Sequence, residues 1–337
     1  MKFSFFHLMP YPYLPDDFDE KYDSSALTYP NANFDPKLGS ALYARYLDEL
    51  EYADQLGFDG IAVNEHHQSA YGLMPSPNLM AAALTRRTSN ARIMVLGNAI
   101  GIRGNPLRVA EEIAMLDLMS DGRVDSGFVR GIGWEYFGHS INPVKSGAGS
   151  TETMKFCAER KYTYMSVYAP TSIVRRWFDG YRQAAADLGY VPDPERIAFS
   201  VPVYVADTDE QAHREARPVL EWVYRKGLKQ TAQMVTPPGY MSPGSLRGVL
   251  ASGMRSLGGF SYEDLLANGQ AVVGSTAAVA DRLAELYEKL GGFGQLIGLF
   301  AIGPSTHQQV MRSAELFASN VMPALRPLGV AAERTTA

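Results

Sequence analysis

The stretch RIMVLGNAIGIRGNPLRVAEEIAMLDLMSDGRVDSGFVR at residues 92–130 decides the fold. Residues 92–100 are almost continuously apolar, which is typical of a strand whose two faces are both covered. Pro106 suits the first turn of the helix that follows, and this helix places its apolar residues on one side. They are Val109, Ile113, Leu116 and Met119. A tight turn then leads into a strand over residues 123–129, so the stretch predicts two parallel strands joined by a helix.

Strand and helix patterns alternate in the same way along most of the chain. Further strands are predicted over residues 3–9, 60–64, 162–167, 197–206 and 295–300. Helices are predicted around residues 42–56, 171–188, 208–227, 276–290 and 305–322. With seven strands in total, this alternation favours βα units around a mostly parallel sheet.

Composition and charge argue against several classes of protein. The chain has 31 basic and 36 acidic side chains among 337 residues, and its net charge of −5 argues against binding to nucleic acid. The single cysteine, Cys157, rules out an intramolecular disulfide and a clustered thiolate metal site. No apolar run is long enough to span a membrane, and the first residues read as a buried strand rather than a signal peptide. We therefore expect a cytoplasmic protein.

Three polar residues, Glu65, His66 and His67, follow the strand at residues 60–64. Neighbouring strand residues point to opposite faces, so the two histidines do not easily chelate one metal, and Glu65 with His67 gives only two ligands. His66 is expected to act as an acid, a base or a hydrogen-bond donor where parallel strands end, or else to cap a helix or pack in the wall. His7 also lies near a strand end, and function and packing are both open for it.

Two features could hold a phosphate. The segment GAGSTETMKFCAER at residues 147–160 places Ser150 and Thr153 at a helix start, where free N–H groups and the helix dipole favour an anion. An ordinary helix cap explains the same pattern, and a cap is the interpretation we prefer for VVGSTAAVADRL at residues 272–283. Arg130 follows a predicted strand in VRGIGWEYFG, and its guanidinium suits a phosphate there, with a surface ion pair as the alternative.

Five segments, taken in order, resemble the bacterial luciferase family of flavin-dependent monooxygenases. They are FDGIAVNEHH, RIMVLGNAIGIRGNPLRVAEEIAMLDLMSDGR, VDSGFVRGIGWEYFG, GAGSTETMKFCAER and VVGSTAAVADRL. The resemblance implies a single α/β domain over residues 1–337 with the (β/α)8 fold of a TIM barrel. It also implies reduced FMN from a separate flavin reductase, and dioxygen that is activated through a flavin hydroperoxide to oxygenate a small organic substrate. The apolar helix faces could serve a homodimer, which we expect.

The resemblance assigns roles to residues near the flavin ring. His66 matches the active-site histidine of the family. Asn98-Ala99 matches a non-proline cis peptide beneath the flavin ring, and Ile132 matches an apolar contact to that ring. These positions come from three different predicted strand ends, so a parallel sheet would bring them to one edge.

The same resemblance assigns phosphate contacts to Arg130 and to the hydroxyl groups of Ser150 and Thr153. One feature departs from the family, because only 21 residues separate Val129 from Thr151. Family members usually have several dozen more residues there, including the fourth helix and the fifth strand. Either these elements are absent, or the sequence lacks residues that the molecule has. A true deletion predicts an open barrel with a displaced phosphate site.

The predicted function is therefore an FMN-dependent monooxygenase. The long segments at residues 10–38 and 228–268 are candidates for a lid that keeps water from the reactive flavin. Two alternatives use the same barrel, namely a deazaflavin-dependent hydride-transfer enzyme and a non-catalytic flavin-binding partner subunit. A metal hydrolase built on Glu65 and His67 is a further alternative.

Overall fold

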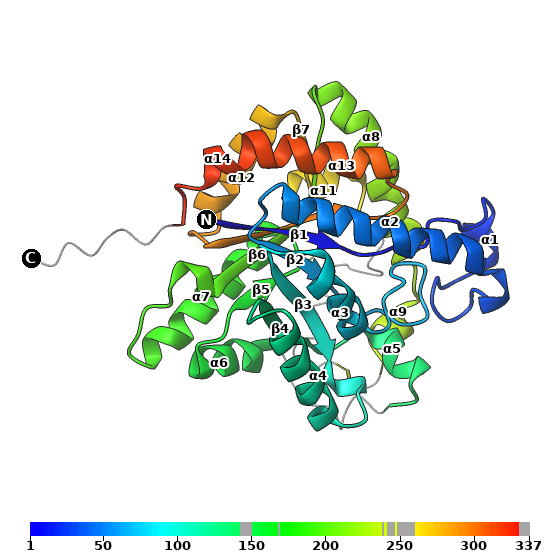
Figure 1. The fold of residues 1–337 in the computed structure, drawn as a ribbon, viewed down its shortest axis with the longest axis horizontal. Coiled ribbons are helices and arrows are strands. Elements are labelled where there is room, and N and C mark those ends of the chain that lie inside the picture. The colour runs from blue at the N-terminus through cyan, green and yellow to red at the C-terminus, as the bar shows by residue number, and fades with distance from the viewer. Residues whose placement is uncertain (142–149, 168, 238, 241–246, 248–259, 330–337) are drawn as a thin grey trace, which may run out of the picture.

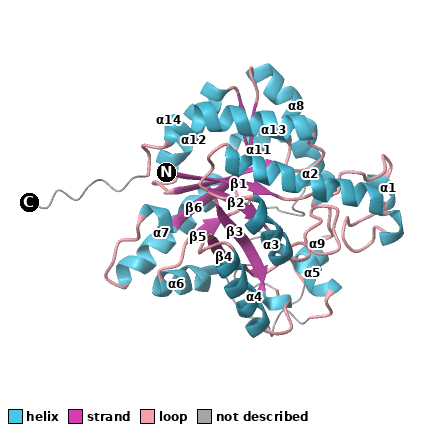
Figure 2. Cartoon of the chain, viewed as in Figure 1, coloured by secondary structure: helices cyan, strands magenta, loops and turns pink. Residues whose placement is uncertain are grey.

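The fold is known from a computed structural model, which describes residues 1–141, 150–167, 169–237, 239–240, 247 and 260–329. The side chains of residues 150–152 and 232 are outside this description. Strands and helices alternate to give an α/β structure, in which helices surround a curled parallel sheet (Figure 1, Figure 2). No helix in these ranges combines the length and the apolar character needed to cross a bilayer.

Eight parallel strands form the sheet in the described residues. They are β1 (Lys2–His7), β2 (Gly60–Val63), β3 (Arg92–Ala99), β4 (Val124–Val129), β5 (Tyr164–Ser166), β6 (Ile197–Val205), β7 (Val272–Gly274) and β8 (Gln295–Ala301). Their order is β4-β3-β2-β1-β8-β6-β5, and β7 pairs with the end of β6. All seven predicted strands are confirmed. The eighth, β7, was not expected, because its three residues are too few to show a strand pattern.

Helices follow most of the strands along the chain. The longer ones are α2 (Pro36–Gln55), α3 (Pro77–Arg87), α4 (Pro106–Met119), α6 (Ser150–Arg160), α7 (Thr171–Asp187), α8 (Asp209–Trp222), α12 (Thr276–Lys289) and α13 (His307–Leu316). The shorter ones are α1 (Phe18–Lys21), α5 (Gly133–Gly138), α9 (Ala232–Val235), α11 (Tyr262–Ala267) and α14 (Met322–Leu325). The predicted period of α2 is confirmed by its buried residues Leu42, Tyr46, Leu50 and Ala53.

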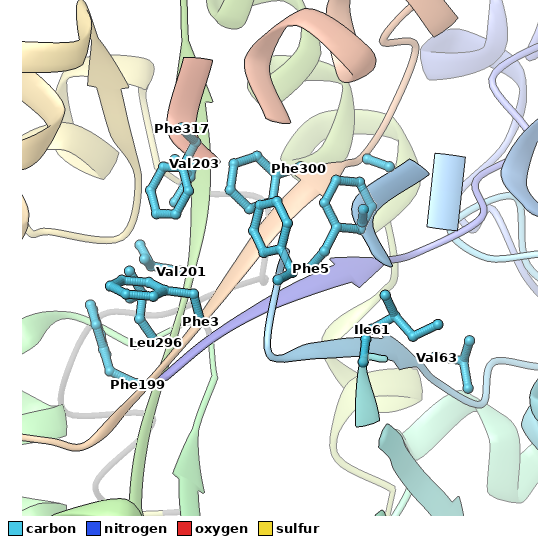
Figure 3. Packing of buried hydrophobic residues seen from close by; sticks show 14 of the residues in the cluster. Phe3, Phe5, Ile61, Val63, Phe199, Val201, Val203, Leu296, Phe300 and Phe317 are labelled. Atoms are coloured by element: carbon cyan, nitrogen blue, oxygen red, sulfur yellow. The ribbon is translucent and has the colours of Figure 1, made fainter. Parts of the chain in front are cut away.

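The main core lies between the outer face of the sheet and the surrounding helices. Phe5 of β1 and Phe300 of β8 stack with ring centroids 5.1 Å apart, and Phe317 packs edge-on against Phe300 at 5.0 Å (Figure 3). A second cluster covers the inner face of the sheet and includes Phe6, Ala62, Met94 and Ile297. Burial of each large apolar side chain contributes about 1.5–3 kcal/mol, so the two clusters together hold the strand ends in place.

The curled sheet is not closed within the described residues. The strands β4 and β5 stand at the two ends of the strand order, so this part of the chain does not form the complete (β/α)8 barrel that was expected. As an edge strand, β4 leaves the Phe128 side chain 59% exposed. Residues 142–149, on which the expected loss of the fourth helix and the fifth strand depends, lie outside the described residues.

His7 is the last residue of β1, and its side chain packs on the outer face of the sheet against Tyr46 and Glu49 of α2. The structure therefore shows the packing role that was left open for this residue. It is fully buried, and its Nδ1 accepts a hydrogen bond from the Met9 N–H at 2.9 Å. Its Nε2 therefore carries the proton and donates to the Glu49 carboxylate at 2.8 Å. Burial lowers the pKa of His7, which agrees with a neutral ring. The alternation of strand residues explains the placement, since His7 shares its face with Phe5.

Candidate active site at the tips of three strands

The carboxyl ends of β2, β3 and β4 lie side by side and carry most of the predicted site residues. The register pairs Val63 of β2 with Val95 of β3, and Ala99 of β3 with Val129 of β4. The residues that follow each strand are therefore neighbours, as expected at the carboxyl end of a parallel sheet. The structure brings together His66, Asn98, Ala99, Arg130 and Ile132 at this edge.

His66 is held by a buried carboxylate. Its Nδ1 lies 3.2 Å from Oε1 of Glu135 in α5, and the His66 side chain is only 13% exposed. Because a carboxylate accepts hydrogen bonds, Nδ1 carries a proton, and Nε2 is the ring nitrogen left to exchange one. The edge of the Tyr71 ring packs against the imidazole, with centroids 4.7 Å apart. These contacts fix the orientation of His66.

Glu135 also holds the turn that follows β4. Its Oε2 accepts the Ile132 N–H at 2.8 Å, which completes a capping interaction at the start of α5. Its Oε1 accepts the His67 N–H at 3.3 Å in addition to the His66 contact. One fully buried side chain therefore connects the histidine after β2 with the turn after β4.

Glu65 ties the end of β2 to the end of β3. It accepts hydrogen bonds from the Arg103 guanidinium at 2.8 Å and from the Ala99 N–H at 3.0 Å, and its other oxygen lies 2.8 Å from His67 Nε2. Burial alone would raise the pKa of Glu65, but the hydrogen bonds from His67, Arg103 and Ala99 outweigh it and lower the pKa. Glu65 is therefore an ionised structural anchor. In the described part of the chain, no group of three or more His, Cys, Asp or Glu side chains is placed to hold a metal ion.

The cis peptide bond does not lie where it was expected. The structure has it between Leu96 and Gly97, whereas the resemblance placed it between Asn98 and Ala99. At Gly97 the backbones of β3 and β4 leave no room for a side chain, because a Cβ there would lie 2.5 Å from the Gly127 carbonyl group. The β3–β4 register also shifts between Val95 and Asn98. The irregular backbone of β3 therefore lies at Gly97, beside Gly127, and not at Asn98.

Arg130 has no ion-pair partner in the residues that the structure describes. Its guanidinium instead stacks on the Tyr240 ring, with the central carbon 4.0 Å from the ring centroid. Burial raises the pKa of Tyr240 to about 12, so its hydroxyl stays protonated and donates to the Gly131 carbonyl at 2.7 Å. The Tyr136 hydroxyl donates to the Arg130 carbonyl at 2.6 Å. Among the described residues, Arg130 therefore stacks on a tyrosine ring and does not form the surface ion pair that was the alternative.

Several buried polar atoms at these strand tips have no hydrogen-bond partner in the described part of the chain. They are both amide atoms of Asn64, the Asn98 amide nitrogen, Nε of Arg130 and the indole nitrogen of Trp134. Buried polar groups in native proteins are normally paired, so such a cluster indicates a place where a polar ligand supplies the partners. Amide groups and one guanidinium fit the polar ring edge and the phosphate of a flavin nucleotide.

Of the two expected phosphate hydroxyls, the structure describes only that of Thr153. Ser150 begins α6, but its side chain lies outside the described residues. Thr153 is exposed on α6 and lines a cavity of about 850 Å³ together with Phe156, away from the hydrogen-bond network around His66. The roles of these two residues stay predictions.

The two candidate lid segments contact each other. Lys229 donates from its ammonium group to the Asp19 carbonyl at 2.6 Å, and its own carbonyl accepts the Ser25 N–H at 3.1 Å. Further along the second segment, α9 packs on α5, so closely that a Cβ on Gly133 would lie 2.3 Å from the Val235 carbonyl oxygen. Much of the second segment, residues 241–246 and 248–259, lies outside the described residues.

Sequence reasoning did not identify Glu135, Arg103 or Tyr240. Glu135 could have been found, because a glutamate three residues after a helix cap is a known capping pattern. Arg103 contacts Glu65, which is 38 positions away in the sequence, and Tyr240 contacts Arg130, which is 110 positions away. No local sequence pattern predicts contacts between residues so far apart.

Comparison with known proteins finds a matching family model along most of the chain. The model of a protein family described as luciferase-like monooxygenase matches residues 27–140 and 135–292. The alkanal monooxygenase beta chain of Vibrio harveyi is 44% identical over 82 residues, which cover 24% of this chain and 25% of that protein. Limonene 1,2-monooxygenase of Rhodococcus erythropolis is 24% identical over 362 aligned positions, which cover 92% of this chain and 88% of that protein.

Solved structures of the same shape use more than one cofactor. The oxygenating constituent of 3,6-diketocamphane monooxygenase from Pseudomonas putida, in complex with FMN, superposes with a TM-score of 0.67 at 19% identity and covers 90% of this chain and 98% of that one. A monooxygenase from Streptomyces bottropensis gives a TM-score of 0.70 at 20% identity, with 96% and 99% covered. An F420-dependent secondary alcohol dehydrogenase gives 0.62 at 15% identity, with 96% and 99% covered. At sequence identities of 15–20%, these similarities show a shared fold and nothing more.

Proposed function

The chain belongs to the luciferase-like monooxygenase family, and from this premise we propose that it is a single-domain, flavin-dependent monooxygenase. In this proposal it uses reduced FMN and dioxygen to oxygenate a small organic substrate. The observation that carries the proposal is the cluster of buried, unpartnered polar atoms around Arg130 and Asn98, next to a histidine with a fixed orientation.

Arg130 and the strand-tip amides are the residues that would hold the flavin nucleotide. The Arg130 guanidinium would bind the phosphate through charge-assisted hydrogen bonds, supported by the hydroxyls of Ser150 and Thr153. The Asn98 amide nitrogen, which has no partner among the described residues, would donate to the polar edge of the ring, and Ile132 would contact its apolar part. When bound, reduced FMN supplies the two electrons with which one oxygen atom of dioxygen enters the substrate and the other leaves as water.

His66 would move the proton that this chemistry requires. Glu135 holds its Nδ1, so Nε2 gives or takes the proton, and the same carboxylate fixes the turn at Ile132. The contacts of residues 10–38 with Lys229 and Gln230 would help to exclude water from the reacting atoms. Exclusion of water matters because, in its presence, reduced flavin and dioxygen are consumed without formation of the oxygenated product.

Oxygen dependence tests this function against its alternatives. A flavin reductase should supply reduced FMN in an assay with isotopically labelled dioxygen, and the product should contain one labelled oxygen atom. Turnover in the absence of dioxygen with a deazaflavin would instead show a hydride-transfer enzyme, as in the F420-dependent structural relative. Tight flavin binding without reductase-dependent oxygen uptake would show a non-catalytic partner subunit.

We also propose that the protein is a homodimer. Helix α4 exposes the apolar side chains of Leu107, Met115 and Leu118, and Leu79 of the neighbouring α3 is exposed as well. An apolar patch of this kind on two adjacent helices is typical of an interface, and an identical partner would offer the same patch. Light scattering should give twice the 37.0 kDa of one chain. The mass of one chain would contradict the proposal.

A further inference from the structure

A cavity of about 850 Å³ lies between the edge strands β4 and β5 and extends along the inner face of the sheet. Its apolar wall includes Met94, Leu96, Phe128, Phe156, Met165, Val167 and Ile297. Ligand pockets usually measure about 300–1,000 Å³, so the cavity has room for an organic molecule as well as for water. It is not the strand-tip site described above, since neither His66 nor Arg130 lines it.

The charged residues at the rim of this cavity neutralise one another. Arg92 pairs with Asp125 at 2.6 Å, and Lys2 pairs with Glu195 at 2.7 Å. Asp59 pairs with Arg326 at 3.0 Å. The two other charged lining residues, Asp193 and Arg196, have opposite signs and share the turn before β6. A charged ligand would therefore find no unmatched counter-charge at the rim, which favours a neutral one.

The wall of the cavity exposes apolar surface that a ligand could cover. Phe128 on β4 is 59% exposed, and Phe156 on α6 is 48% exposed. Removing apolar surface from water stabilises a complex, so an apolar molecule gains affinity from contact with these two rings. Ser126 and Thr163 also line the cavity and offer hydroxyl groups to one or two oxygen atoms of the ligand.

The inner end of the cavity comes close to the proposed flavin contacts. Leu96 lines it and precedes Asn98 by two residues on β3, and Val129 lines it and directly precedes Arg130. A molecule in the cavity can therefore approach the strand tips from the inside of the sheet. We propose that the cavity is the substrate site, which takes a neutral, mainly apolar molecule through the opening between β4 and β5. This inference rests on the proposed monooxygenase function.

Cys157 gives a direct test, because it is the one cysteine of the chain and it lines the cavity. The unmodified protein is treated with N-ethylmaleimide, and the alkylation rate of Cys157 is followed by mass spectrometry. Decan-2-one should slow alkylation at least about fivefold, whereas decanoate, of similar length but charged, should slow it less than about twofold. Equal rates with and without decan-2-one, or equal protection by both compounds, would overturn the proposal.

A matched pair of variants locates the protecting molecule. Val167→Trp fills part of the cavity and should abolish protection by decan-2-one, while Val191→Trp, on an exposed loop, should leave protection unchanged. FMN affinity measured on each variant shows whether the protein is folded and keeps its strand-tip site. If decan-2-one protected Cys157 but the protein bound no FMN, the proposed monooxygenase function would be wrong and the cavity would still be a ligand site. If the protein carried out FMN-dependent oxygenation but decan-2-one did not protect Cys157, only the proposal of a substrate site in the cavity would be wrong.

Discussion

When His66 is replaced by alanine, the rate of product formation should fall about 100-fold, which is within the range that a positioned proton-transfer group contributes. Glu135 already occupies Nδ1, so the loss concerns the proton exchanged at Nε2. FMN affinity should change less than about threefold, because Arg130 and the strand-tip amides carry binding in this account. Oxygen uptake should continue while hydrogen peroxide accumulates in place of product. An oxygen electrode combined with a product assay measures both quantities.

The control for this variant is His213→Ala. His213 lies on α8, bonds to the Tyr262 hydroxyl at 2.6 Å and has no contact with the strand tips among the described residues. Its replacement should leave the ratio of product to consumed oxygen unchanged. If His66→Ala kept the same ratio as the unmodified protein, His66 would have no part in proton transfer.

Replacing Arg130 by methionine should weaken FMN binding about 10- to 100-fold, the loss expected for charge-assisted hydrogen bonds to a phosphate. Methionine keeps much of the apolar stem that packs near Tyr240 but removes the charge. Riboflavin lacks the phosphate, so its affinity should change less than about threefold. Quenching of flavin fluorescence gives both dissociation constants.

Arg175→Met provides the matched control for Arg130→Met. Arg175 lies on the surface of α7 and pairs with Asp179, so its loss should not affect either flavin. A parallel drop in FMN and riboflavin affinity in Arg130→Met would mean that the variant disturbs the ring site. In that case the phosphate would have to bind elsewhere.

The positions of seven of the strands along the chain could be predicted from the sequence, because buried parallel strands are apolar runs. The strands at residues 92–99 and 197–205 are almost entirely buried, and their pattern is unmistakable. β7 escaped notice since three residues show no period. The expectation of a closed barrel came from the resemblance to the family, since no local sequence pattern predicts closure. The structure places β4 and β5 at the two ends of the strand order.

The site was predictable where function follows from position along a strand. His66 and Arg130 come directly after strands, so their place at one edge of the sheet follows from parallel topology. His7 is itself the last residue of a strand, but its side chain lies on the outer face of the sheet and binds Glu49. The partners Glu135 and Tyr240 come from a short helix and a distant segment, and sequence spacing says nothing about such contacts.

A crystal structure of the FMN complex shows whether the tips of β2, β3 and β4 bind FMN. We expect the phosphate within hydrogen-bond distance of the Arg130 guanidinium and the flavin ring against Ala99 and Ile132. We also expect a new partner for the Asn98 amide nitrogen. An ordered FMN between β4 and β5, with Arg130 still stacked on Tyr240 and the Asn98 amide unpaired, would contradict these expectations.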